Sequence, residues 1–186
     1  MFQESLKQVS NEYVTDEMKK QYLAESNFLI AYYHFLSMRS YGPTMIIRSV
    51  IDLETPISGF PERSSIDEVV AFINEKLDEA MSEGGLPTTW SGKDYGRATR
   101  LAALALKSRV YLYAASPLYN GNTEMYADFR SPLDGRQLIA QEKSQAKWEI
   151  SATQTKYAID EVEKAFAGTQ NSSGNDSLII RLMGCF

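Results

Sequence analysis

The sequence has little of the chemistry from which many active sites are built. Its 186 residues include one cysteine, Cys185, and one histidine, His34. An internal disulfide and a Cys₄ or Cys₂His₂ zinc site are therefore excluded, and we expect no metal site. A Ser-His-Asp or Cys-His mechanism would have to use His34 alone, so we expect no catalytic residue, no enzyme activity and no cofactor.

Long hydrophobic runs and an excess of basic charge are also absent. No apolar run approaches the roughly 20 residues that cross a bilayer. The first ten residues, MFQESLKQVS, lack a charged segment followed by an apolar one, so we expect no signal peptide in this chain. The formal net charge of −5 argues against a nucleic-acid partner, because phosphate neutralisation needs clustered Lys and Arg.

What the sequence does have is helical periodicity. Hydrophobic residues make up 44% of the chain, a globular proportion, and no alternating run is long enough to predict a strand. The longest helical pattern covers residues 16–41 and ends at Gly42-Pro43. Because it carries two apolar stripes, we expect this helix to be packed on both sides. One stripe is Ala24, Phe28, Ala31, Phe35 and Met38, and the other is Tyr22, Leu29, Tyr32, Tyr33 and Leu36.

A second helix is predicted to begin near Ser65, where Glu68 completes a capping box. Its single apolar stripe includes Leu77, and its opposite face, which includes Asn74, is expected to face water. Further helices are predicted over 98–115 and 148–167, the last closed by Gly168, and a shorter one over 2–11.

Small residues recur at similar spacing in three of these helices, as in tetratricopeptide repeats, where they allow close helix crossing. We therefore predict an all-α fold, a tetratricopeptide-like array of helix pairs. Long irregular segments at 43–63, 83–96 and 116–147 have the length of functional loops. We expect a helical domain over 1–168, followed by a polar linker and truncated tail over 169–186.

Three sequence blocks carry a family resemblance. They read AESNFLIAYYHFLSMRSYG at 24–42, ERSSIDEVVAFINEKLDEAM at 62–81 and GRATRLAALALKSRVYLYAASPLYNGN at 96–122. In order and spacing they resemble the helical part of the SusD/RagB family of outer-membrane nutrient-binding lipoproteins. One departure is Ile30, where the family usually has Arg, so we expect a partner such as Glu25 to be left without it.

The resemblance implies non-catalytic capture of glycans or similar nutrients at the bacterial outer membrane. The implied partners are an oligo- or polysaccharide and a SusC-like TonB-dependent transporter that receives it. It also implies a surface-exposed, lipid-anchored full-length protein, whose anchor and signal peptide are absent from this chain. Two alternatives stay open: a helical-repeat adaptor for protein–protein interaction and, third, a carbohydrate-active enzyme.

Aromatic and asparagine residues in the loops are the candidate glycan-binding residues. Sugar rings stack their C–H faces on aromatic side chains, and amides hydrogen-bond their hydroxyls. The alternative for each residue is that it holds its own loop against the helices. The candidates are Trp90 and Tyr95 in one loop, and Tyr119, Asn120, Asn122 and Tyr126 in the next.

Charged residues and His34 are assigned structural roles. We expect His34 to be a hydrogen-bonded residue between elements, and carboxylate pairs such as Glu75/Glu79 to lie on a solvated helix face. The basic residues Arg97, Arg100, Lys107 and Arg109 are expected to form ion pairs with neighbouring helices.

Overall fold

The computed structural model describes residues 2–9 and 14–167, and within these residues the fold is all-α, as the sequence predicts. No strand occurs there, and only isolated β-bridges such as Met45–Arg63 join the loops. The helices are α1 (Phe2–Gln8), α2 (Asp16–Tyr41), α3 (Ile66–Ala80), α4 (Arg100–Ala115), α5 (Thr123–Tyr126) and α6 (Gln145–Ala165). Short 3₁₀ turns lie at Ile57–Gly59 and Gly92–Asp94.

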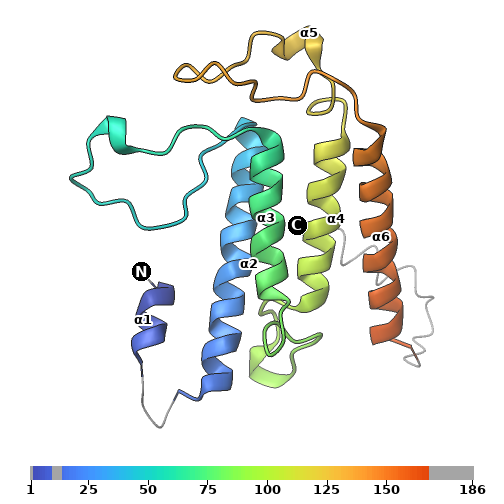
Figure 1. Cartoon of the computed structure of the whole chain (residues 1–186). Helices are drawn as coiled ribbons and strands as arrows, with labels where there is room; N and C mark the ends of the chain where they lie inside the picture. The colour runs from blue at the N-terminus through green and yellow to red at the C-terminus, as the bar shows by residue number, and fades with distance from the viewer. Residues whose placement is uncertain (1, 10–13, 168–186) are drawn as a thin grey trace.

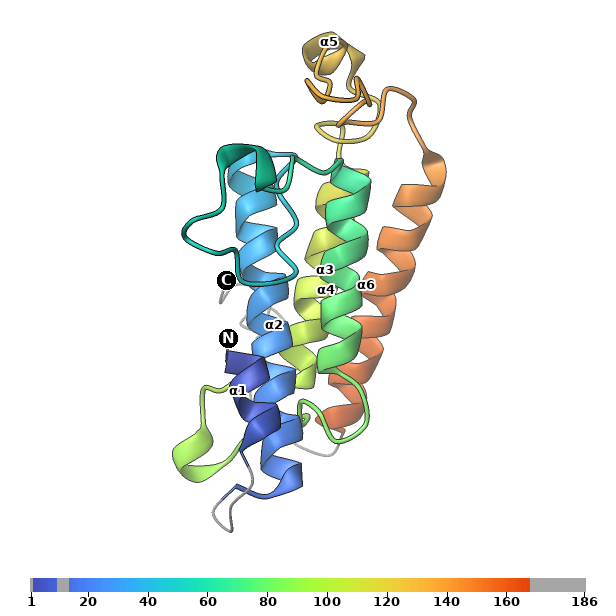
Figure 2. The same ribbon diagram turned by 60° about the vertical axis from the view of Figure 1, so that its left-hand side comes forward.

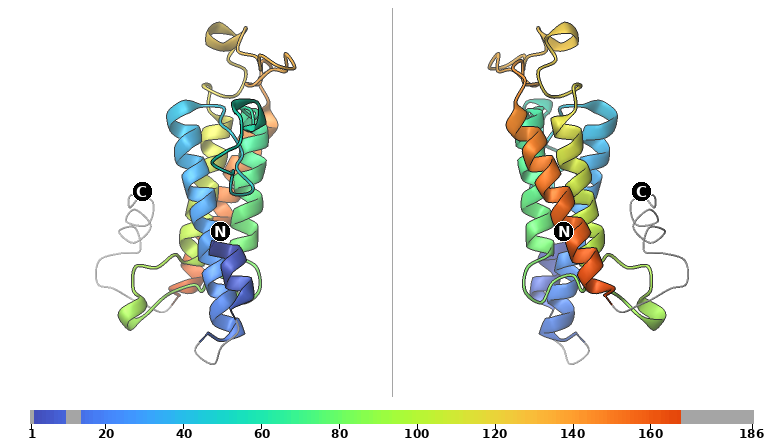
Figure 3. Two further views of the ribbon diagram at one scale, coloured as in Figure 1. Left: turned by 90° about the vertical axis from the view of Figure 1, so that its left-hand side faces the viewer. Right: turned by 90° about the vertical axis from the view of Figure 1, so that its right-hand side faces the viewer.

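The four long helices α2, α3, α4 and α6 lie side by side with their connections at the two ends (Figure 1). Each packs on the next, α3 on α2, α4 on α3 and α6 on α4, and α1 lies against α2 (Figure 2). Helices that pack on their sequence neighbours are typical of repeat arrays. The loops therefore gather at opposite ends of a helical bundle (Figure 3).

Helix α2 is buried along one stripe and only partly buried along the other. The stripe from Ala24 to Met38 is buried as predicted, with Phe35 at 1% exposure. Tyr22, Tyr32 and Leu36 of the second stripe are half-buried, but Leu29 and Tyr33 are 46% and 63% exposed, so the expectation of packing on both sides is wrong for these two residues. The reason is geometric: α3 and α4 both contact α2 through its first stripe.

Helix α3 begins with the predicted capping box. The Ser65 hydroxyl accepts from the Glu68 N–H, and the Glu68 carboxylate accepts from the Ser65 N–H at 2.7 Å. Leu77 is fully buried, as predicted. Asn74 is also buried, at 7% exposure, which corrects the assignment of Asn74 to the solvated face. The Asn74 amide donates to the Val70 carbonyl at 2.9 Å, which offsets part of the cost of burying it.

Several helix boundaries differ from the sequence prediction: α1 ends at Gln8 and α6 at Ala165, two to three residues early, and two helix starts are shifted. Helix α4 begins at Arg100 because the Thr99 side chain accepts from the Ala102 N–H and caps the helix there. Helix α6 begins at Gln145, three residues before the predicted start at 148. The predicted cap Gly168 and the predicted linker and tail over 169–186 lie outside the described residues.

Candidate ligand-binding site

The two loop-bearing ends of the bundle divide the six candidate glycan-binding residues between them. The loop between α3 and α4 carries Trp90 and Tyr95, and the segment after α4 carries the other four (Figure 1). The 16 residues of α4 separate these loops. At 1.5 Å per residue this is about 24 Å, so one sugar unit cannot touch both groups.

At the α5 end, two of the candidates are buried and hydrogen-bonded within the protein. Tyr119 is 3% exposed and donates its hydroxyl to the Met38 carbonyl at 3.1 Å; burial raises the pKa of this phenol. Asn120 donates to the carbonyls of Ser144 and Ala115 and accepts from the Ser144 N–H at 2.8 Å. These contacts tie the start of α6 to the end of α4, so both side chains position the loop.

The other two candidates at this end are more accessible. The Asn122 carbonyl oxygen accepts from the Met125 N–H at 3.0 Å and caps α5. The Tyr126 ring contacts Phe129 at a centroid distance of 5.8 Å, and its backbone carbonyl accepts from the Gln137 amide. Tyr126 is half-buried, so one part of its ring still reaches the surface.

At the opposite end, Arg97 joins the α3–α4 loop to α2. Its guanidinium lies 4.1 Å from the Trp90 ring centroid and 5.4 Å from that of Tyr22. It also donates to the carboxylates of Glu25, at 2.8 Å, and Asp94, at 2.9 Å. The Glu25 hydrogen bond is the main cause that raises the pKa of Arg97, so this cation stays charged at all pH values of interest.

This cluster corrects one expectation and locates two candidates. Glu25 was expected to lack a partner because Ile30 replaces the family's Arg. Instead, Arg97, 72 positions away, forms an ion pair with it. Trp90 donates its indole N–H to the Ala98 carbonyl at 2.7 Å, so the ring is fixed in place. Tyr95 in the same loop is 86% exposed, and its side chain faces solvent.

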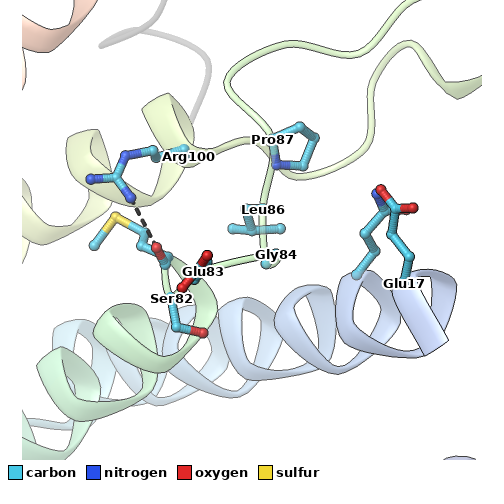
Figure 4. A pocket seen from close by; sticks show the side chains of 10 residues that line it. Glu17, Ser82, Glu83, Gly84, Leu86, Pro87 and Arg100 are labelled. Carbon is cyan, nitrogen blue, oxygen red and sulfur yellow. Dashed lines mark hydrogen bonds between the residues drawn. The ribbon is translucent and has the colours of Figure 1, made fainter.

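A cavity of about 480 Å³ lies beside the start of this loop (Figure 4). The first turns of α2 form one wall, the start of α4 forms another, and loop residues after α3 lie between them. Its polar lining comes from Glu17, Gln21, Ser82, Glu83 and Arg100. Its apolar lining comes from Met81, Leu86 and Pro87.

Tight backbone geometry shapes this cavity. A Cβ atom on Gly85 would lie 2.4 Å from the Ala80 carbonyl oxygen, so only glycine allows this approach. The Leu86 N–H donates to the same carbonyl at 2.9 Å. Arg100 holds both sides of the turn: its guanidinium donates to the Met81 carbonyl and its backbone N–H to the Pro87 carbonyl.

Sequence reasoning missed this cavity. Gly84 and Gly85 were visible in the sequence, but their only obvious use, a phosphate-binding loop, lacks the required pattern. The α2 residues Glu17 and Gln21 lie more than 60 positions before the loop, and nothing local marks them as its neighbours. In the sequence, Gly84-Gly85 followed by the apolar Leu86 is the signal that could have indicated a tight turn after the helix.

The structural roles assigned to His34 and to the carboxylates are observed. His34 donates from Nδ1 to the Ile30 carbonyl at 2.7 Å and accepts at Nε2 from the Ile47 N–H at 3.3 Å. Glu75 binds Arg48, and this hydrogen bond is the main cause that lowers its pKa. Over the described ranges, no group of three His, Cys, Asp or Glu is placed to hold a metal ion.

The basic residues of α4 and of the preceding loop make different contacts. Lys107 pairs with Asp78 on α3, as expected of an ion pair between helices. Arg100 binds a backbone carbonyl instead of a carboxylate, which corrects that expectation. In the part of the chain that the structure describes, no helix has the length and apolar character to span a membrane.

The sequential packing of the helices defines a helical-array fold, and comparisons with known proteins identify the family. Residues 1–112 match the SusD-like family model described as "Starch-binding associating with outer membrane". The chain belongs to this SusD-like family, as the sequence resemblance indicated. A search of curated proteins finds no match.

Solved structures agree with this assignment. BT4246 is 35% identical with a TM-score of 0.75, covering 86% of this chain and 27% of that one. A selenomethionine form of BT4246 is 32% identical with a TM-score of 0.72, covering 97% and 29%. A SusD-like protein (BF3747) from Bacteroides fragilis is 34% identical over 55% of this chain and 19% of its own, with a TM-score of 0.50. The chain thus spans between a quarter and a third of the length of BT4246.

Proposed function

We propose that this chain is the helical part of a protein that captures glycans or similar nutrients at the bacterial outer membrane. The observation that carries the proposal is the family match over residues 1–112, whose description names starch binding and the outer membrane. The 35% identity to BT4246 over 86% of the chain supports it. In this proposal the helices form a rigid platform, and ligand recognition belongs to the loops.

The proposed action is binding and transfer, with no bond made or broken. The captured glycan passes to a SusC-like TonB-dependent transporter, and the full-length protein is lipid-anchored and exposed at the cell surface. These features come to this chain through its family and are part of the proposal.

Among the six candidate residues, accessibility favours some for direct ligand contact. Tyr95 has an exposed ring, and Tyr126 and Asn122 keep part of their surface open. Trp90 is half-buried and stacked on Arg97, so a ligand could contact only the part of the indole ring that Arg97 does not cover. We propose that Tyr119 and Asn120 act by holding the loop in which the accessible residues lie.

Affinity electrophoresis tests glycan capture. The chain is run in native gels with and without soluble starch, next to a protein that binds no polysaccharide. We expect starch to retard the chain relative to that reference. The reducing-end content of starch incubated with the chain should stay constant, since a rise would indicate an enzyme.

Equal migration in both gels would contradict glycan capture by this chain and favour the adaptor alternative. One observation gives that alternative a basis: Leu29 and Tyr33 leave an apolar strip of α2 exposed. The two proposed functions use different surfaces: a protein-binding adaptor would use this strip of α2, and glycan capture would use the loops.

A further inference from the structure

We infer that the cavity between α2 and the α3–α4 loop is a binding subsite for a neutral sugar unit. The inference rests on the proposed function and deepens it, because it assigns both a place and a ligand class. Its volume of about 480 Å³ lies within the roughly 300–1,000 Å³ typical of small-molecule sites.

The polar groups of the cavity are available to a ligand. In the part of the chain that the structure describes, the side chains of Glu17, Gln21 and Glu83 line the cavity without an assigned hydrogen bond or ion pair. The Arg100 guanidinium donates from Nη1 to the Met81 carbonyl, and its other N–H groups have no assigned acceptor. The lining therefore presents both donors and acceptors.

A sugar hydroxyl matches this combination because it donates and accepts at once. Carboxylates such as those of Glu17 and Glu83 accept charge-assisted hydrogen bonds from hydroxyls. The Gln21 amide and the Arg100 guanidinium donate to the hydroxyl oxygens. Glu17 and Arg100 lie on opposite sides of the cavity, so a ligand between them could be held from two directions (Figure 4).

The apolar lining completes the match. Leu86 and Pro87 lie between the two polar walls and offer hydrocarbon surface to the C–H face of a sugar ring (Figure 4). Leu86 is buried and Pro87 half-buried, so this surface is held in place by the protein. A site with an apolar floor and a few polar groups is the usual composition of a small-ligand site.

The charge of the lining sets the ligand class. Two carboxylates, Glu17 and Glu83, and one guanidinium, Arg100, line the cavity, and the side chain of Lys20 lies against the lining residue Gly84, so the charges at the cavity balance. A charged sugar, acidic or basic, would meet two like charges there, which is unfavourable. We therefore assign the cavity to neutral sugars in preference to acidic or basic ones.

Isothermal titration calorimetry of the full chain tests the assignment. The probes are maltoheptaose, an oligogalacturonate of the same length, and a chitosan oligomer as the cationic counterpart. We expect maltoheptaose to bind at least tenfold more tightly than the other two. Glu17→Ala and Gln21→Ala should each weaken maltoheptaose binding at least fivefold.

Matched controls come from α6, far from the cavity. Glu149→Ala and Gln145→Ala replace exposed residues of the same types at the opposite end of the bundle and should change the affinity less than twofold. Thermal unfolding of all four variants should match that of the parent, which separates lost binding from lost structure. Glu83→Gln should narrow the gap between maltoheptaose and oligogalacturonate, because it removes one repelling charge.

The outcomes separate this inference from the function on which it rests. If maltoheptaose binds the parent and the cavity variants equally well, the cavity assignment is overturned while glycan capture stands. Preference for the chitosan oligomer would overturn the neutral-sugar assignment and identify a site for amines. If no probe binds the parent chain, both the inference and glycan capture by this chain are contradicted.

Discussion

The two ends of the bundle are built from similar residue types but use them differently. At the α5 end, Tyr119 and Asn120 are buried and give their polar atoms to backbone groups of the protein. At the other end, Trp90 and Arg97 form a stacked cluster near the surface. Among the residues that the structure describes, the side chains of Glu17, Gln21 and Glu83 in the cavity beside that cluster have no protein partner.

The difference indicates that burial, and not residue type, decides which of these side chains are committed to contacts within the protein. A buried amide must find hydrogen-bond partners within the protein, because water cannot supply them. An accessible amide or carboxylate can exchange water for a ligand hydroxyl at little cost. At the α5 end, Tyr119 and Asn120 are therefore committed to the fold, whereas the polar groups of the cavity end stay accessible, which is why we propose the cavity for binding.

The largest expected effect comes from the core that holds both ends together. Leu77→Asp buries a charge at a position with 0% exposure and should lower the free energy of unfolding by about 4 kcal/mol or more. Chemical denaturation followed by circular dichroism measures this change. Leu53→Asp, at a fully exposed loop position, is the matched control and should have little effect. A mild effect at Leu77 would show that α3 is not a core helix.

At the α5 end, Asn120→Ala should destabilise the protein by about 2–3 kcal/mol, because it leaves several buried backbone groups without partners. Asn122→Ala removes only the cap of a short helix and should cost under about 1 kcal/mol. Denaturant midpoints of the two variants give the comparison. Equal losses would mean that Asn120 is no more structural than Asn122.

At the cavity end, Arg97→Ala should cost about 1 kcal/mol, because the guanidinium is partly exposed and water screens its ion pairs. Its clearer signature is optical. In a Trp148→Phe background, emission from Trp90 should shift when the stacked cation is removed, while Arg97→Lys should shift it less. Unchanged emission would contradict the stacking of Arg97 on Trp90.

The smallest effect concerns the pH dependence of the α3 capping box. The N–H of Ser65 donates to the Glu68 carboxylate and is the main cause that lowers its pKa below the ordinary 4.5. A lowered pKa stabilises the folded state at neutral pH, and this contribution is lost as the pH falls through the pKa of the folded state.

Glu68→Gln should therefore cost under about 1 kcal/mol at pH 7, and this difference from the parent should shrink at acidic pH. Urea titrations at several pH values measure it, with Glu163→Gln as the control. A difference that grows on acidification would contradict the lowered pKa.

The parts of the fold that could be predicted are those with local causes. Helix α2 ends where predicted because Gly42 and Pro43 stop it. Helix α3 begins at Ile66 because Ser65 caps it together with Glu68, three residues further on. The buried stripe from Ala24 to Met38 follows from spacing alone.

The parts that could not be predicted depend on contacts between distant segments. Arg97 meets Glu25 across 72 positions, and no local pattern distinguishes this pair from other charged residues. Asn74 lies on the polar side of α3 by spacing, yet it is buried in the fold. The cavity has the same cause, since α2 supplies one wall and the α3–α4 loop another.

The central claim is the proposal that the cavity between α2 and the α3–α4 loop binds glycan, while Tyr119 and Asn120 at the α5 end hold the fold. Titration of the ¹⁵N-labelled chain with maltoheptaose, followed by NMR, tests it residue by residue. The account predicts shift changes concentrated at residues 17–25 and 82–100. Changes confined to residues 116–144 would contradict it, and so would a spectrum that maltoheptaose leaves unchanged.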